Sequence, residues 1–151
     1  MSDARKTKVI RFAVLALASC LALAGCATAE SGAKHPAAKR SLEEQWGVQI
    51  ASLRMTAAGR IIDFRYRVID PEKAALLADR HVKPVLIDQA SSRKLAVPVA
   101  PKIGSLRQTS SKLTAGRIYF ILFSNSEQLI KAGSKVTVVI GDFRAENLTV
   151  E

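Results

Sequence analysis

The sequence predicts an all-β domain, built as a two-sheet antiparallel sandwich of about seven to eight short strands with one or two short helical turns. Two observations carry this prediction. Short runs rich in β-branched and aromatic residues recur from residue 46 to residue 151, separated by short turn-forming segments. The clearest run, at residues 61–68, alternates between apolar and charged side chains, as a strand with one buried and one solvated face does.

The alternating run supplies the strongest single element. Apolar residues occupy each even position from 62 to 68, whereas Asp63, Arg65 and Arg67 occupy odd positions. A helix would turn Arg65 and Arg67 toward the apolar stripe, so a strand fits the pattern better. A preceding strand at residues 48–53 alternates in the same way, and the turn at 56–59 joins the two runs as a hairpin.

The middle of the chain predicts a short helix and a second hairpin. Asp70 at an N-cap and Pro71 at the first helical position begin a helix of two turns at most. Strands at residues 85–88 and 94–99 then flank a polar turn. Pro98 cannot donate a ladder hydrogen bond, so the second arm is expected at a sheet edge.

The last third of the chain predicts two further strands and a closing hairpin arm. Residues 117–123 are apolar on both faces, which predicts a central strand covered on both sides. Residues 125–132 predict one helical turn, and residues 135–140 another strand. The final run, 143–150, places Leu148 and Val150 on one face.

The order of these elements resembles the immunoglobulin-like domains common in envelope lipoproteins. The closing segment Gly133-Ser134-Lys135-Val136-Thr137-Val138 carries most of the resemblance. The likeness concerns the fold pattern, and it implies no particular function.

The N-terminal segment has the pattern of an export signal. Four basic residues within positions 1–11 precede twelve uncharged residues, 12–23, that are rich in Ala and Leu. The run is too short for a transmembrane helix, which needs about 20 apolar residues. Cys20 lies inside this run.

The uncharged run ends in Leu23-Ala24-Gly25-Cys26, which resembles the lipobox of bacterial lipoproteins. The resemblance covers residues 1–26. It implies cleavage before Cys26, a thioether-linked lipid on its thiol, and a further acyl chain such as palmitate on the new amine. The alternative is ordinary secretion, with Ala27-Thr28-Ala29 as the cleavage site before Glu30.

These features divide the chain into three parts. Residues 1–25 are the predicted signal peptide, Cys26 and residues 27–45 are a lipidated, flexible linker, and residues 46–151 are the sandwich domain. Ser41 and Glu44 have the spacing of a capping box, which predicts a helical turn at the end of the linker. In the lipoprotein family, Ala rather than Asp after the cysteine favours the outer membrane, facing the periplasm, in a Gram-negative host.

The formal net charge of +10 belongs partly to the signal peptide. Residues 1–25 carry four basic residues against Asp3, a charge of +3, and +10 minus +3 leaves +7 for the rest. In an exported protein such a charge suits an anionic envelope surface or an acidic protein partner. Nucleic acid is not expected as a partner, because of the predicted compartment and an aromatic content of only 5%.

The sequence predicts no catalytic residue, cofactor or metal site. The domain has one histidine, His81, and no nucleophile-elbow, zinc-protease, paired-cysteine or phosphate-loop motif. The leading prediction is therefore a non-enzymatic binding or adaptor module of the cell envelope, attached to the membrane through the lipid on Cys26. A periplasmic carrier of a small ligand or metal is the alternative, and an enzyme is third.

Four arginines form the candidate contact surface for an envelope protein or an anionic ligand. Arg65 and Arg67 share one face of a strand, and Arg54 and Arg60 lie on the neighbouring strand and turn. The competing interpretation is a solvated sheet face with cross-strand ion pairs.

The lipobox makes a direct prediction about Cys26. The substitution Cys26→Ala removes the only thiol in the motif, so incorporation of labelled palmitate into the protein should fall to background in a bacterial host. Labelling measured by autoradiography after immunoprecipitation tests this. A variant that is still labelled at the wild-type level would show that the anchor is assigned wrongly.

Overall fold

The structure, a computed structural model, describes residues 42–151. The predicted signal peptide, the lipobox and the linker as far as residue 41 lie outside the described residues. Residues 42–46 are helical, and the second helix is α2 (Ala75–Ala78). The strands are β1 (Val48–Thr56), β2 (Ile61–Val68), β3 (Val85–Asp88), β4 (Lys94–Ala96), β5 (Val99–Ala100), β6 (Gly104–Ser105), β7 (Ile118–Ser124), β8 (Lys135–Ile140) and β9 (Phe143–Thr149).

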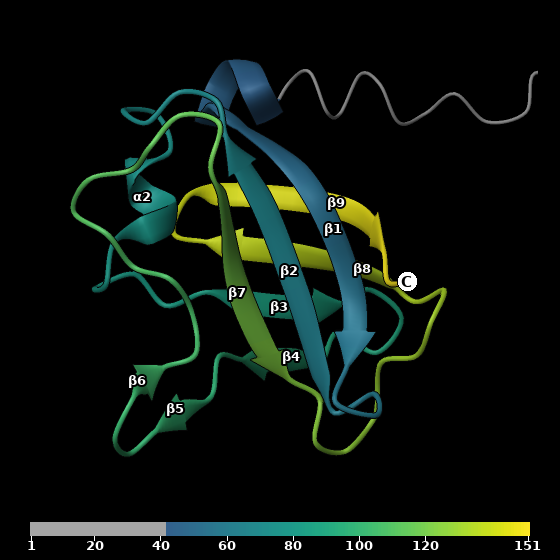
Figure 1. The fold of residues 1–151 in the computed structure, drawn as a ribbon. Coiled ribbons are helices and arrows are strands. Elements are labelled where there is room, and N and C mark those ends of the chain that lie inside the picture. The colour runs from purple at the N-terminus through teal and green to yellow at the C-terminus, as the bar shows by residue number, and fades with distance from the viewer. Residues whose placement is uncertain (1–41) are drawn as a thin grey trace, which may run out of the picture. The chain divides into compact units, whose positions relative to one another are not determined.

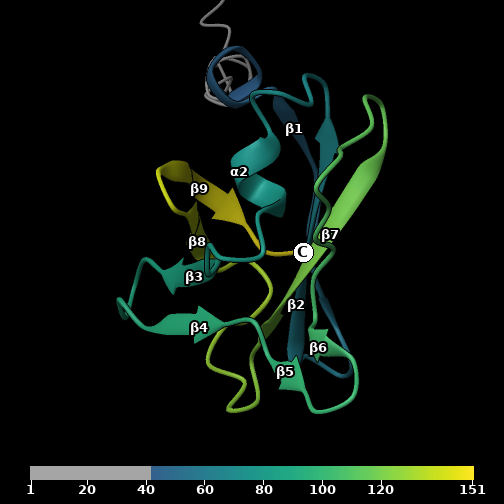
Figure 2. The ribbon, with the colours of Figure 1, turned by 90° about the vertical axis from the view of Figure 1, so that its left-hand side faces the viewer.

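The strands form a sandwich of two antiparallel sheets, which confirms the predicted fold class. One sheet has the order β1-β2-β7 and the other β4-β3-β8-β9, while β5 and β6 form a separate small pair. These are the A-B-E and C′-C-F-G orders of an immunoglobulin-like Greek key. Figure 1 shows the strands of the two sheets crossing at a steep angle, and Figure 2 shows the sheets as separate layers with α2 between them at one end.

The core fills the space between the two inner faces. The four even-numbered residues of β2, from Ile62 to Val68, are fully buried, and they face apolar residues of β3, β8 and β9. Phe64, Tyr66 and Tyr119 form a row of stacked rings, with centroid distances of 5.9 and 6.0 Å. Aromatic side chains contribute large buried areas, so this row is a main source of stability.

Two β-bulges change which alternate residues of a strand face the core. The β1–β2 register shifts between Ile50 and Ser52, so Val48 and Leu53 are both buried although their positions differ in parity. A second shift in the β8–β9 pair allows Ala145 and Leu148 to be buried together. The simple alternation predicted for residues 48–53 therefore fails after residue 50.

The prediction of a central, doubly covered strand at residues 117–123 is wrong. β7 lies at the end of its sheet, and its side chains alternate between buried and partly exposed. A loop covers part of its open edge instead of a strand: Leu122 N donates to Leu106 O at 3.0 Å, and Gln108 N donates to Phe120 O at 3.1 Å.

The helical turn predicted within residues 125–132 is also wrong. The buried carboxamide of Asn125 donates to Gly59 O and Ile130 O at 2.8 and 2.9 Å, and it accepts a hydrogen bond from Ile130 N. These bonds hold the segment as an irregular loop, because an asparagine side chain competes with helical backbone bonding.

A short helix follows Asp70 as predicted, but it begins later than expected. Asp70 Oδ1 accepts hydrogen bonds from the backbone N–H groups of Glu72 and Lys73, whereas helix α2 begins at Ala75 with Ala74 at its N-cap, so the predicted cap at Asp70 and helix start at Pro71 are wrong. Other local predictions are confirmed. β3 and β4 pair as the predicted hairpin, and β4 is an edge strand. Leu148 and Val150 are both buried.

Gly47 forms the joint between the first helical turn and β1. Its carbonyl accepts hydrogen bonds from Ile69 N and Asp70 N at 2.7 and 3.0 Å. Its φ is +61°, and a Cβ at this position would lie 2.6 Å from Asp70 Cβ. Leu42 and Trp46 pack against the core from the adjacent helix, so contacts with the sandwich begin before the predicted boundary at residue 46.

We predict that Gly47→Ala lowers the free energy of unfolding by about 2–3 kcal/mol, because a steric clash adds to the strain of a positive φ. The matched control is Gly133→Ala, where φ is +85° but no atom lies within 4 Å of the new Cβ. That change should cost only about 1 kcal/mol. Urea denaturation of both variants decides: equal losses would mean that the close approach to Asp70 has no effect.

Candidate functional site

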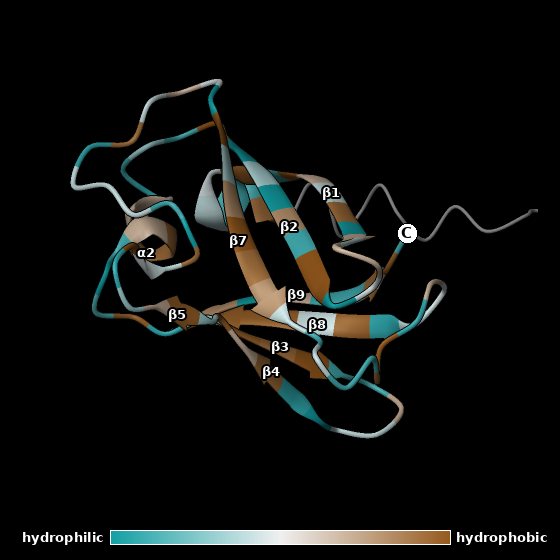
Figure 3. Ribbon diagram, turned by 60° about the horizontal axis from the view of Figure 1, so that its bottom comes forward, coloured by the Kyte–Doolittle hydropathy of each residue, from teal (hydrophilic) through white to brown (hydrophobic). Residues whose placement is uncertain are grey.

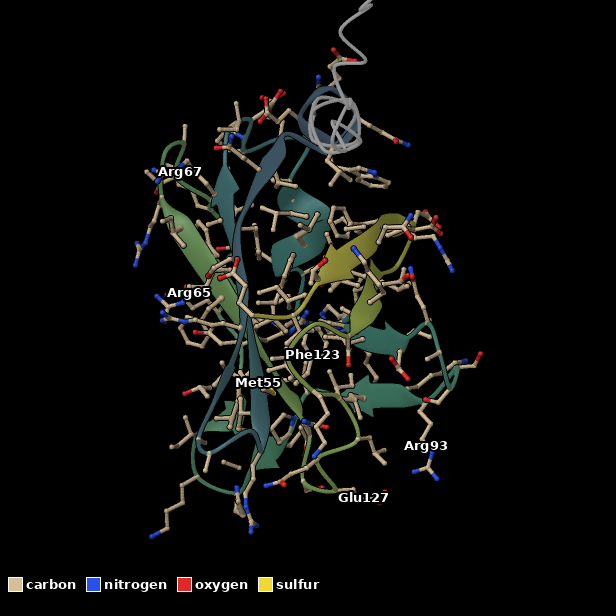
Figure 4. The ribbon with its side chains drawn as sticks, turned by 90° about the vertical axis from the view of Figure 1, so that its right-hand side faces the viewer. Met55, Arg65, Arg67, Arg93, Phe123 and Glu127 are labelled. Carbon is tan, nitrogen blue, oxygen red and sulfur yellow. The ribbon has the colours of Figure 1, made fainter. Side chains whose placement is uncertain are left out.

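The candidate basic surface lies on the outer side of the three-stranded sheet. In the β1–β2 register Arg54 is opposite Asp63, and Arg65 is opposite Ser52. Because alternate residues of a strand share a face, Arg54, Asp63, Arg65 and Arg67 line one surface. Figure 4 shows Arg65 and Arg67 projecting from the side of β2 that faces away from Phe123.

Asp63 joins two of the predicted arginines. Its Oδ2 accepts a hydrogen bond from Arg65 Nε at 2.9 Å and lies 3.7 Å from Arg54 Nε. The sequence places Asp63 on a solvated face, but the residue is only 4% exposed. The structure explains the difference, because two guanidinium groups flank the carboxylate on a strand with neighbours on both sides.

The other two arginines are held apart from this pair. Arg67 lies one pleat further along β2, and its Nη1 donates to Gly116 O at 2.8 Å. Arg60 lies in the turn before β2, at the end of the strand opposite to Arg67. The structure therefore brings Arg54 and Arg65 together, sets Arg67 beside them, and leaves Arg60 separate.

Strand β7 adds an apolar row that the sequence interpretation missed. Ile118 is opposite Arg67, Phe120 opposite Arg65, and Leu122 opposite Asp63. Since β7 is an edge strand, these side chains join the outer face instead of a second core. Figure 3 shows the hydrophilic middle of β2 beside the more hydrophobic β7. The outer face is therefore amphipathic, with a cationic row next to an apolar one.

A long segment without acidic residues surrounds this strand. The 38 residues from 89 to 126 contain six basic residues and no Asp or Glu. The basic residues are Arg93, Lys94, Lys102, Arg107, Lys112 and Arg117, and all except Arg107 are exposed. The sequence contains this signal, but inspection strand by strand does not find it because the segment crosses four strands, β4 to β7.

Arg107 has an interior position. It is 8% exposed, and its Nη2 donates to the backbone oxygen of Asp79 at 2.5 Å. Burial lowers the pKa of Arg107, and the nearby Tyr66 and Asp79 partly oppose this effect. Among residues 42–151, Arg107 Nη1 and the hydroxyl of Tyr66 have no hydrogen-bond partner. Arg107 therefore fastens its loop to the sandwich and presents little charge at the surface.

A small pocket of about 180 Å³ lies between the β3–β4 hairpin and the loop after β7. The ion pair between Arg93 Nη1 and Glu127 Oε2, at 3.0 Å, joins the two segments. Ligand pockets usually enclose about 300–1,000 Å³, so this one is small for an organic ligand. Within the part of the chain that the structure describes, no three His, Cys, Asp or Glu residues are grouped to hold a metal ion.

No family model, curated protein or solved structure matches this chain. Among residues 42–151, no helix has the length and apolar character needed to cross a membrane.

The interior hydroxyls give a paired prediction. Tyr66→Phe removes a buried oxygen without a partner, so stability should stay the same or rise by about 1 kcal/mol. Tyr119→Phe removes the acceptor of Thr114 N, a 3.0 Å bond, and should cost about 1 kcal/mol. Thermal unfolding at pH 7 checks both changes, and a larger loss in Tyr66→Phe than in Tyr119→Phe would contradict the argument.

Tyr66 also makes the stability of the protein depend on pH. Burial raises the pKa of Tyr66, and the positive charge of Arg107 partly opposes this. The unfolded chain then ionises first, so stability is unaffected by this group below about pH 10 and falls as the pH rises above it. Above that pH the wild type should lose more stability than Tyr66→Phe.

Proposed function

We propose that this protein is a lipid-anchored module of the bacterial cell envelope that binds an anionic surface through the outer face of its three-stranded sheet. The lipobox-like motif ending at Cys26 supports the anchor and the location. One observation carries the binding surface: Arg65 and Arg67 lie beside the apolar row of β7, Arg54 lies across Asp63 on β1, and Asp63 is the only acidic residue on the outer face of these three strands.

The arginines of this face keep donors for a ligand. Arg65 uses Nε for Asp63, and Arg67 uses Nη1 for Gly116. A guanidinium has five N–H donors, so both groups retain others. A planar fork of donors suits phosphate and carboxylate oxygens, which it can bind in bidentate fashion. The geometry therefore favours phosphate-bearing headgroups or an acidic protein surface.

Asp63 gives this face a fixed arrangement. A nearly buried carboxylate orients Arg65 and attracts Arg54, so the two guanidinium groups are positioned before any partner arrives. Pre-organisation lowers the entropic cost of binding. The carboxylate of Asp63 also neutralises one of the positive charges on this face. The face therefore differs from a patch that carries basic residues alone.

A carrier of a small ligand is the second candidate. The pocket beside Arg93 and Glu127 is the observation that favours it, because this pocket combines charged, polar and apolar lining at the ends of two loops. Its small volume ranks it below the sheet face.

The sheet-face proposal is tested with residues 42–151, which include every strand of the sandwich. The double variant Arg65→Glu/Arg67→Glu should bind vesicles of phosphatidylglycerol about tenfold more weakly in a sedimentation assay, because two attractive charges become repulsive. Raising the salt concentration should reduce binding of the unaltered protein as well.

The control has the same change in charge on the other sheet. Lys135→Glu/Arg144→Glu alters two exposed residues of β8 and β9. If both double variants lose binding equally, total charge decides the interaction, and the proposed face has no special role.

A further inference from the structure

The small β5–β6 hairpin, residues 98–105, exposes the two most accessible large apolar side chains among residues 42–151. Val99 is 74% exposed and Ile103 is 80% exposed, whereas the other exposed large apolar residues range from 40% to 47%. Exposed apolar side chains that gather on one short element commonly mark a contact site.

The hairpin holds these side chains in a defined turn. Val99 pairs with Ser105 and Ala100 pairs with Gly104. Ile103 N donates to Ala100 O at 3.2 Å, and Leu106 N donates to Pro98 O at 3.0 Å. Two prolines, at positions 98 and 101, restrict the backbone further. The apolar tip is therefore ordered before it meets a partner.

The hairpin stands at the edge of the three-stranded sheet. Leu106, which follows it directly, accepts a hydrogen bond from Leu122 of β7. Figures 1 and 2 both show β5 and β6 at the end of the domain opposite to the helix at residues 42–46. The tip thus lies away from the point where the chain enters the sandwich.

The sequence on both sides of the tip carries charge of one sign. Lys102 lies between Val99 and Ile103 in the sequence, and the hairpin belongs to the 38-residue segment without acidic residues. An aliphatic pair beside cations is the combination that partitions into the interface of an anionic bilayer.

Other occupants fit this tip less well. Protein interfaces are usually anchored by Trp, Tyr or Arg, and residues 98–105 contain none of these. A symmetric contact with a second copy would set Lys102 and its basic surroundings against themselves.

We propose that the β5–β6 hairpin inserts Val99 and Ile103 into the interfacial region of a phospholipid bilayer that carries anionic headgroups, with Lys102 at the level of the phosphates. This inference goes beyond the proposed function, because it concerns a different surface and requires no lipid on Cys26.

A tryptophan placed in the hairpin tests the insertion in the full chain. The sequence has a single tryptophan, Trp46, so Trp46→Phe supplies a silent background. In this background, Ile103→Trp is compared with Thr149→Trp, an exposed site on β9 in the other sheet. Both variants carry the same N-terminal residues, so the difference between them reports on the hairpin alone.

The vesicles contain equal parts of phosphatidylcholine and phosphatidylglycerol, with bromine on the acyl chains as a quencher. The emission of Ile103→Trp should shift to the blue and be quenched, while that of Thr149→Trp should stay unchanged. Equal spectra for the two variants would overturn the proposal. A blue shift that appears without vesicles and grows with protein concentration would also overturn it, in favour of self-association.

Loss of the apolar tip should weaken binding. Val99→Ser/Ile103→Ser should lower the partition coefficient onto the same vesicles about tenfold relative to the unaltered chain. Leu129→Ser, at an exposed leucine of the loop after β7, is the control and should have a much smaller effect.

The two proposals fail separately in this design. If the Ile103→Trp emission matches that of Thr149→Trp while Arg65→Glu/Arg67→Glu reduces binding, the hairpin proposal is wrong and the sheet face stands. If the Ile103→Trp reporter is quenched and the arginine reversals change nothing, the hairpin stands and the sheet face does not.

Discussion

Burial of the inner face of β2 is the interaction on which the rest of the domain depends. β2 is the only strand that joins β1 to β7, and its four inward side chains are fully buried against the opposite sheet. Residues 42–151 contain no cysteine, so no disulfide supports the fold. The packing of the inward side chains also fixes the positions of the outward side chains of β2. Asp63 and Arg65 are placed because Ile62, Phe64 and Tyr66 are fixed, so the candidate site and the core cannot vary independently.

The local parts of the fold could be predicted from the sequence, because their causes are local. Alternating side chains identify β2, and Asp70 with Pro71 identifies the turn that leads into α2. The faces of β1 and β9 could not be predicted in full, because a bulge depends on the partner strand and leaves no mark in hydropathy. The edge position of β7 cannot be predicted for a related reason. Its apolar outer side chains fit either a covered central strand or an edge strand beside a loop, and only the pairing separates the two.

In the candidate site, too, some features can be predicted from the sequence and others depend on how the strands pair. A hairpin about residues 56–59 already places Arg54 near Arg65, so that grouping follows from the sequence. The bond from Arg67 to Gly116 joins residues 49 positions apart, and the burial of Asp63 depends on strands on both sides of it. Such contacts depend on topology. The absence of acidic residues from 89 to 126 can be seen in the sequence. The exposure of Val99 and Ile103 cannot be predicted from it, because a short apolar run is equally compatible with burial and with exposure to solvent.

The position of Trp46 has a mechanical consequence. Its ring meets Phe143 edge-on at a centroid distance of 5.7 Å, directly before the Gly47 joint. A domain held from its N-terminal side receives a pulling force at the contacts of Leu42 and Trp46 before the force reaches the β1–β2 ladder. Separation of the two rings would expose the only indole of the chain to water and change its fluorescence. The fluorescence of Trp46 would therefore report the moment at which a pulling force begins to detach the N-terminal end of the domain.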